Sequence, residues 1–137
     1  MHLVEVLIAA SLLAAVCVSL PHAFVSAVRA NLAAADVTWT AVLAAQKVEE
    51  LRSQPFPEPG VLELHDLLDA RGHPVDGPQR SAAYIRTWRT EASAAAPEQT
   101  IVITVVVAPY RHAAGKSGDA AAPGATRLVT LRTRKTT

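Results

Sequence analysis

The first 54 residues of this 137-residue chain contain no glycine and a single proline. All six glycines lie at or beyond Gly60, and Pro21 is the only proline before Pro55. From Leu3 to Ser53 helix-breaking residues are therefore missing except for one proline, and Ala, Leu, Val, Gln, Lys and Glu dominate. This composition predicts one long N-terminal helix that Pro21 kinks and that ends at the proline-rich stretch from Gln54 to Gly60.

No Asp, Glu, Lys or Arg occurs from Val6 to Val28, where the chain also carries its single cysteine, Cys17. About 20 apolar residues cross the roughly 30 Å hydrocarbon core of a bilayer. A secretory signal peptide would have a basic start and a shorter apolar run. Glu5 stands at the head of this run, and an ionisable group at the edge of a membrane span is a candidate functional residue because it costs free energy there. We therefore expect a transmembrane segment over residues 3–28.

Most motifs of enzymes and metal sites are missing from the sequence. There is no His-Glu-x-x-His pair, no Cys/His ligand spacing, no phosphate-binding glycine loop and no nucleophile elbow. His65, Asp66, His73 and His112 are the residue types of a hydrolase or metal site, but they lack the required arrangement. We expect no enzymatic activity, no cofactor and no metal. The net charge of +1 gives no general attraction to nucleic acid.

The polar half of the predicted helix carries two apolar stripes. At 100° per residue, Trp39 falls on one stripe and Val48 on the opposite one. Two apolar faces imply a second packing partner besides the chain's own domain, although an alanine-rich helix is apolar all round by composition alone. Trp39 favours a partner, because a large aromatic side chain is unfavourable on a solvated face. One stripe contains Val37, Ala41, Ala44, Val48 and Leu51, the other contains Val28, Leu32, Ala35, Trp39 and Val42, and one polar flank contains Arg29, Asp36 and Lys47.

A small β domain is expected after Gly60. Alternating and β-branched residues predict strands, and the apolar segment 100–108 should be central, with the long helix covering one of its faces. Residues 61–69 fit either a strand or a helical turn, and 109–125 form a linker. In the last strand we expect Val129 and Leu131 to face inward. The predicted strands are 83–90, 100–108 and 126–133.

The segment from Leu3 to Ala9, preceded by Met1, resembles the start of mature type IV pilins and type II secretion pseudopilins. In that family a prepilin peptidase removes a basic leader ending in Gly, the new terminal residue is N-methylated, and a Glu follows four residues later. Met1 and Glu5 have this spacing. His2 replaces the usual Thr or Ser, and Pro21 lies about one residue earlier than the kinking proline of many pilins. The sequence has no leader or Gly before Met1. We therefore expect either that the leader was trimmed or that the start codon was assigned too late.

A second resemblance lies at the end of the predicted helix, from Ala44 to Arg52. The pattern Ala-Gln-Lys-apolar-Glu-Glu-Leu-Arg is similar to one in minor pilins of the type IV pilus modification branch and in minor pseudopilin I. Lys and Glu at helical spacing are common on helix surfaces, so the segment gains weight only together with the N-terminal motif.

The resemblance implies an α+β, pilin-like fold with one long helix on a small antiparallel sheet of about three strands. The helix would occupy residues 1–54, a connecting region 55–82 and the β domain 83–137. It also implies a structural minor pilin or pseudopilin in the bacterial inner membrane, with a periplasmic C-terminal domain, extracted into a filament on assembly. Glu5 would pair with the N-terminal amine of a neighbouring subunit, and Met1 would be the methylated residue.

The implied partners are other pilins through the N-terminal helix, the inner membrane, the prepilin peptidase and the assembly machinery. Two alternatives stay open: a single-span anchored periplasmic domain that does not polymerise, and a DNA-uptake pseudopilin. Basic residues on the strands could contact phosphates, but exposed charges that prevent edge-to-edge aggregation explain them more simply. DNA is therefore not expected as a partner. These basic residues are Arg86, Arg89, Arg127, Arg132, Arg134 and Lys135.

Overall fold

The computed structural model describes residues 2–57, 61–76, 81–110 and 123–134. The chain divides into two compact units, Met1–Ala34 and Ala35–Thr137, and the second unit is called the head below. One helix, α1 (His2–Ser53), contributes to both units. Its end just before Gln54 and Pro55 agrees with the prediction, because proline disfavours a helical conformation in the residue that precedes it.

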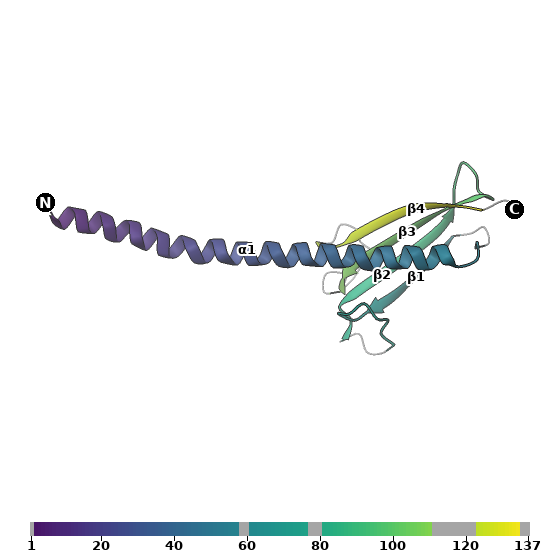
Figure 1. Cartoon of the computed structure of the whole chain (residues 1–137), viewed down its shortest axis with the longest axis horizontal. Helices are drawn as coiled ribbons and strands as arrows, with labels where there is room; N and C mark the ends of the chain where they lie inside the picture. Colours follow the sequence, from purple (N-terminus) through teal and green to yellow (C-terminus); the bar gives the residue numbers. More distant parts are fainter. Residues whose placement is uncertain (1, 58–60, 77–80, 111–122, 135–137) are drawn as a thin grey trace. The chain divides into compact units, whose positions relative to one another are not determined.

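The head contains one antiparallel sheet with strand order β1-β2-β3-β4 (Figure 1). Each strand pairs with its neighbour in the chain, so the sheet is a simple meander. The predicted α+β architecture, one long helix on a small antiparallel sheet, is confirmed. β3 is central, as its apolar sequence predicted. The strands are β1 (Leu62–Leu68), β2 (Tyr84–Ala92), β3 (Thr100–Pro109) and β4 (Thr126–Thr133).

The sheet has four strands, where about three were predicted. The additional strand, β1, lies inside the region 55–82 that was expected to connect helix and sheet. Its leucines at Leu62, Leu64 and Leu68 follow a period of two, which suits a strand, but leucine is not among the residues enriched in strands. Pairing with β2 along its whole length decides between the two conformations that the sequence left open.

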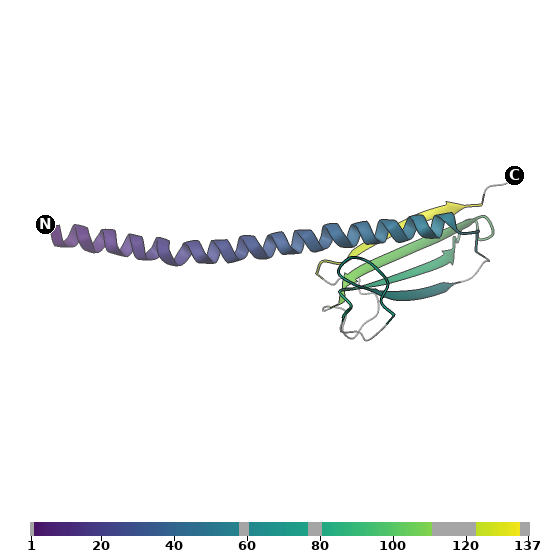
Figure 2. The ribbon, with the colours of Figure 1, turned by 60° about the horizontal axis from the view of Figure 1, so that its bottom comes forward.

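The core of the head lies between one face of the sheet and the part of α1 that belongs to the head (Figure 2). Alternate residues of β3 point toward this helix segment, whereas their neighbours point to the other face. Trp39, Trp88 and Leu128 are partly buried around this cluster. The fully packed members are Leu43, Ala44, Val48, Leu68, Ile101, Ile103, Val105 and Val107.

In β4 the prediction that Val129 and Leu131 face inward is wrong. The two side chains are 56% and 60% exposed. Register explains the difference: Leu128 lies opposite Val105, whose side chain is in the core, so the odd-numbered residues of β4 face away from the helix. A strand that alternates Thr, Arg, Leu and Val presents an apolar residue to either face, and its periodicity alone could not choose between them.

A turn after β1 packs against the helix. Gly72 has φ of 85°, in the region that favours glycine, and a Cβ there would lie 2.5 Å from Cδ2 of Leu43. The carboxylate of Asp69 accepts hydrogen bonds from the backbone N–H groups of Arg71 and His73, at 2.8 and 2.9 Å. The backbone N–H of His73, together with that of Arg71, holds the pKa of the Asp69 carboxyl below its usual value.

Candidate functional site

The N-terminal unit exposes a continuous apolar surface. Among the described residues, α1 is the helix that is long and apolar enough to cross a membrane, and it lies near the N-terminus. The large apolar side chains from Leu3 to Val28 are all exposed in the isolated chain. Soluble proteins rarely expose apolar patches larger than a few hundred Å². This part of the chain therefore requires apolar surroundings, which the hydrocarbon core of a bilayer would supply.

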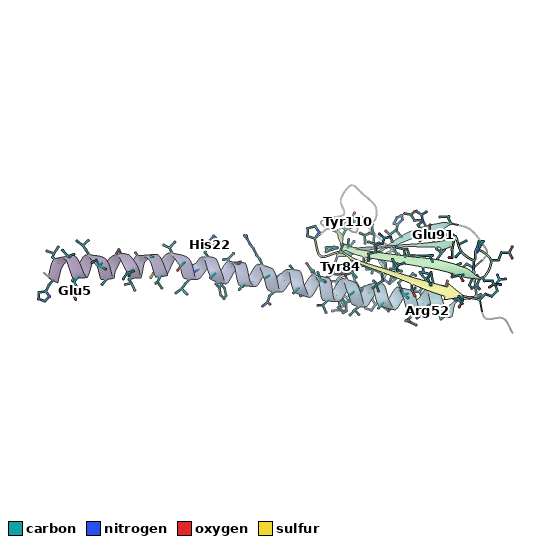
Figure 3. The ribbon with its side chains drawn as sticks, turned by 90° about the horizontal axis from the view of Figure 1, so that it is seen from above. Glu5, His22, Arg52, Tyr84, Glu91 and Tyr110 are labelled. Carbon is teal, nitrogen blue, oxygen red and sulfur yellow. The ribbon has the colours of Figure 1, made fainter. Side chains whose placement is uncertain are left out.

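Glu5 lies in the first turns of α1, and its side chain is 83% exposed (Figure 3). Its Oε2 is 3.9 Å from Nδ1 of His2, so an ion pair forms there only when the imidazole is protonated. A carboxylate at this end of a helix is also favoured by the helix dipole. Met1, the other half of the predicted assembly pair, lies outside the described residues. Because its side chain is exposed, the carboxylate of Glu5 is accessible to a group from another molecule.

Polar side chains within the apolar run bond mainly to their own helix. The hydroxyls of Ser11 and Ser19 donate to the carbonyl oxygens of Ile8 and Val16, at 2.8 and 3.1 Å. Such back-bonding satisfies a hydroxyl where no water is present. The helix continues through Pro21, which lacks the N–H that would close its turn. The kink predicted at Pro21 stays a prediction.

The head's part of α1 packs on the sheet with residues from both predicted apolar stripes. Ala44, Val48 and Leu51 do pack on the sheet, but Val37 of the same stripe is exposed. Trp39, predicted on the other stripe, is partly buried against the core. Val42, from the same stripe as Trp39, is exposed. At 100° per residue Val37 and Val42 lie far apart around the helix, so of these two only Val42 is on the face away from the sheet.

Lys47 was expected on a polar flank, but its side chain is only 8% exposed. Its ammonium lies 4.0 Å from the centre of the Trp88 ring and donates to Oε1 of Glu50 at 2.8 Å. The aliphatic stem is buried while the charge is matched by a ring face and a half-exposed carboxylate. Sequence reasoning missed this arrangement because it depends on which residue of β2 faces the helix.

Two of the basic strand residues that were expected to be exposed instead hold the head together. Arg86, on β2, is buried and forms a two-pronged pair with the carboxylate of Asp66 on β1. Arg132, on β4, donates to the carbonyl oxygens of Leu51 and Gln54 at 3.0 and 2.7 Å. These carbonyls belong to the last turn of α1 and to the residue just after it, where no intrahelical partner exists.

The residue types of a hydrolase are not brought together among the described residues. His65 and Asp66 are neighbours in β1 and therefore point to opposite faces of the sheet, and Asp66 is engaged by Arg86. His73 lies beside Asp69, 3.6 Å away, in the exposed turn. His112 lies outside the described residues. The described part of the chain holds no group of three or more His, Cys, Asp or Glu side chains that could bind a metal ion.

No family model, curated protein or solved structure matches this chain. A functional interpretation therefore depends on three features of the chain itself: the N-terminal carboxylate, the apolar helix and the head. The family resemblance of the N-terminal segment stays a prediction.

Proposed function

We propose that this chain is a structural minor pilin or minor pseudopilin subunit. It is inserted in the bacterial inner membrane through residues 3–28 and assembled into a type IV pilus or a type II secretion pseudopilus, in its tip or initiation complex. One observation carries the proposal: Glu5, an exposed carboxylate, stands at the start of an apolar surface long enough to cross a bilayer, on the same helix that enters the head.

The chemistry of Glu5 supports a role in assembly. A carboxylate at the edge of hydrocarbon is costly unless a cation neutralises it. The N-terminal amine of a neighbouring subunit is such a cation, and attraction between the two is stronger in a low-dielectric environment than in water. Because leaving either charge unpaired is unfavourable, the pair would fix the axial position of one subunit relative to the next.

The outer face of the helix in the head supports a role for helix contacts. Val42 is exposed there, on a segment whose opposite face is filled by the sheet. An exposed apolar side chain on that face suits packing against a helix of another subunit. The remaining partners follow from the resemblance: a prepilin peptidase that exposes Met1, a methyltransferase activity that modifies it, and an assembly machinery that extracts the subunit from the membrane.

The test is Glu5→Ala in the bacterium that produces the chain. The variant should insert in the membrane as the wild type does, because the apolar run is intact, but it should be lost from sheared or purified filaments. Membrane insertion is measured by resistance to alkaline extraction, and incorporation by immunoblotting of the filament fraction.

Matched variants separate charge from stability. Glu5→Asp should retain part of the incorporation, whereas Glu49→Ala, which removes an exposed carboxylate of the head, should retain all of it. Normal incorporation of Glu5→Ala would refute the role of this residue. Absence of the wild-type chain from every filament fraction would favour an anchored domain that does not polymerise. Lost DNA uptake with normal secretion and piliation in a deletion strain would favour the DNA-uptake alternative.

A further inference from the structure

The edge strand β1 has an open stretch of backbone. β1 pairs only with β2, so its other side is an edge of the sheet. The N–H of Val75 donates to the carbonyl of Leu67 at 2.9 Å, and the N–H of Asp69 donates to the carbonyl of His73, so the turn after β1 covers this edge at its C-terminal end. In contrast, no hydrogen bond among the described residues covers the edge at Glu63 and His65.

The direction of the backbone groups follows from alternation. In an antiparallel strand the N–H and C=O of one residue point to the same side, and successive residues point to opposite sides. The backbone N–H and C=O of Leu67 point away from β2, because this carbonyl accepts a hydrogen bond from the N–H of Val75. Glu63 and His65 therefore present their N–H and C=O groups outward. A further strand could form hydrogen-bonded pairs with both of them.

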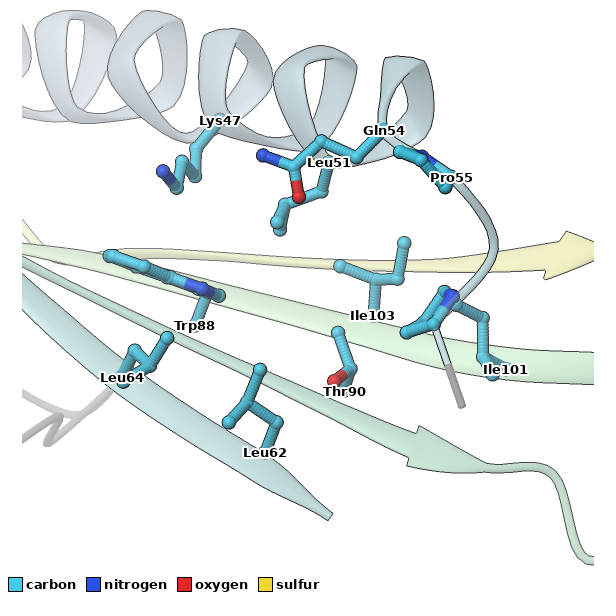
Figure 4. Close-up of a pocket in the computed structure, with 11 residues that line it drawn as sticks. Lys47, Leu51, Gln54, Pro55, Leu62, Leu64, Trp88, Thr90, Ile101 and Ile103 are labelled. Atoms are coloured by element: carbon cyan, nitrogen blue, oxygen red, sulfur yellow. The ribbon is translucent and has the colours of Figure 1, made fainter. Parts of the chain in front are cut away.

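An apolar pocket lies on the helix-facing side of the same strand (Figure 4). Its volume is about 170 Å³, close to that of apolar cavities of about 150 Å³ that accept one benzene ring. Leu62 and Leu64 form its wall on β1 and are 51% and 45% exposed, because α1 does not cover this end of the strand, whereas Leu68 at the other end is buried. Trp88 and Leu51 contribute further apolar surface, and Lys47 and Gln54 lie on the helix side.

The edge and the pocket are in register with one another. A residue of an added antiparallel strand that lies opposite Leu64 would be in a non-hydrogen-bonded pair, the type in which side chains approach most closely. Its side chain would lie on the same face as Leu62 and Leu64, at the pocket. Phenylalanine has the size of the pocket and the length to reach past Leu64.

We infer that the head binds an extended segment of another polypeptide by strand addition to β1. Main-chain hydrogen bonds to Glu63 and His65 hold the segment, and a phenylalanine-sized apolar side chain opposite Leu64 enters the pocket. In this mode of peptide recognition, an open strand edge supplies main-chain hydrogen bonds, and pockets bind every second side chain of the added strand. The inference uses residues of the head alone, so it does not depend on assembly into a filament.

The opposite edge of the sheet is less suited to such a segment. The hollow beside β4 is lined by three arginines, Arg52, Arg132 and Arg134, and Arg132 is already bound to the end of α1. Charged residues at a sheet edge discourage pairing with an apolar strand. On β1 the pocket is lined by Leu62 and Leu64, and the carboxylate of Asp66, which follows on the same face, is already paired with Arg86.

The test uses the full chain in lipid nanodiscs and the probe peptide acetyl-Lys-Thr-Val-Thr-Phe-Thr-Val-Thr-Lys-amide. Two control peptides differ by Phe to Ala, or by N-methylation of the threonines on either side of the phenylalanine. Binding is measured by tryptophan fluorescence and by amide hydrogen exchange at residue resolution. The probe should slow exchange at Glu63 and His65, and each control peptide should bind about tenfold more weakly or not at all.

A substitution in the protein, rather than in the peptide, tests the same strand edge. His65→Pro removes an outward N–H without removing a bond to β2, and proline is tolerated at such positions. It should lose the probe, whereas His65→Ala should keep it. Absence of binding, equal binding of the control peptides, or protection confined to β4 would overturn the inference. Protection of Glu63 and His65 in the chain alone, with dimer formation, would also overturn it in favour of pairing between two copies.

Discussion

At the scale of single residues, the head depends on polar side chains in apolar surroundings. Thr40 is fully buried on α1, and its hydroxyl lies 2.8 Å from Oγ1 of Thr126 and 3.0 Å from the carbonyl oxygen of Gly124. Lys47 and Arg86 are buried beside partners that match their charges. Buried polar groups of this kind cost free energy unless they are paired, so they specify one arrangement of helix and sheet.

Lys47→Ala should lower the free energy of unfolding of the head by about 1–2 kcal/mol, because it removes the buried stem and the contact with Trp88. Lys47→Met, which keeps the stem, should lower it less. Arg52→Ala is the control: its pair with Glu49 is exposed, and the change should stay within about 0.5 kcal/mol. Urea unfolding followed by tryptophan fluorescence measures all three. Equal effects of Lys47→Ala and Arg52→Ala would show that the contact with Trp88 is not stabilising.

Asp69 should make the turn after β1 sensitive to acid. Its pKa is lower in the folded chain than its ordinary value of 3.8, so the associated stability is present above that value and is lost as the pH falls through the folded pKa. Asp69→Asn keeps an acceptor oxygen but cannot titrate, so its free energy of unfolding should depend less on pH in the acidic range. The measurement is urea unfolding of both proteins between neutral and acidic pH. An equal dependence on pH in both proteins would show that Asp69 is not the group responsible.

At the scale of elements, the sequence predicted the helix and the central strand well. The missing glycines and the prolines after Ser53 determined the extent of α1, and the β-branched run determined β3. The orientation of β4 and the burial of Lys47 could not be predicted, because both depend on the register between strands. Leu62 and Leu64 of β1 lie at the edge proposed to bind a peptide. Their exposure could not be predicted either, because it depends on which part of the sheet the helix covers.

Gly72→Ala should destabilise the head by about 1–3 kcal/mol, since the residue has positive φ and the added Cβ would meet Leu43. Leu43→Ala alone should cost about 2–5 kcal/mol through the cavity it leaves. The double variant should cost less than the sum of the two, because the clash is gone although the backbone strain remains. Thermal unfolding of the four proteins measures this coupling. Strict additivity would show that the turn shifts away from the helix instead.

At the scale of the whole molecule, the chain combines a unit that requires apolar surroundings with a unit that has its own core. The described apolar side chains of Met1–Ala34 have no covering element within that unit. The head, in contrast, buries its apolar residues between helix and sheet. A chain held in a membrane that also presents a folded domain in water would need these two kinds of surface.

Arginine in the apolar run should weaken membrane insertion. Each of Leu12→Arg and Leu13→Arg should cost about 2.5–3.5 kcal/mol near the centre of the span, so the double variant should be extracted by alkaline carbonate while the wild type is retained. Leu32→Arg, which lies beyond Arg29, is the control and should leave retention unchanged. Retention of the double variant would indicate that the apolar helix is held by a partner protein rather than by lipid.

The meander also determines the order in which the head can form during translation. Each hairpin joins neighbouring strands, so β1, β2 and β3 can pair as soon as they leave the ribosome. The bonds from Thr40 to Gly124 and Thr126 span 84 and 86 residues of chain, and they wait for the strand that is made last. Until then the part of the helix around Thr40 lacks its polar partners, although the strands made earlier already supply the apolar partners of Leu43 and Val48. The contact between the helix and β4 is therefore the last part of the head to form.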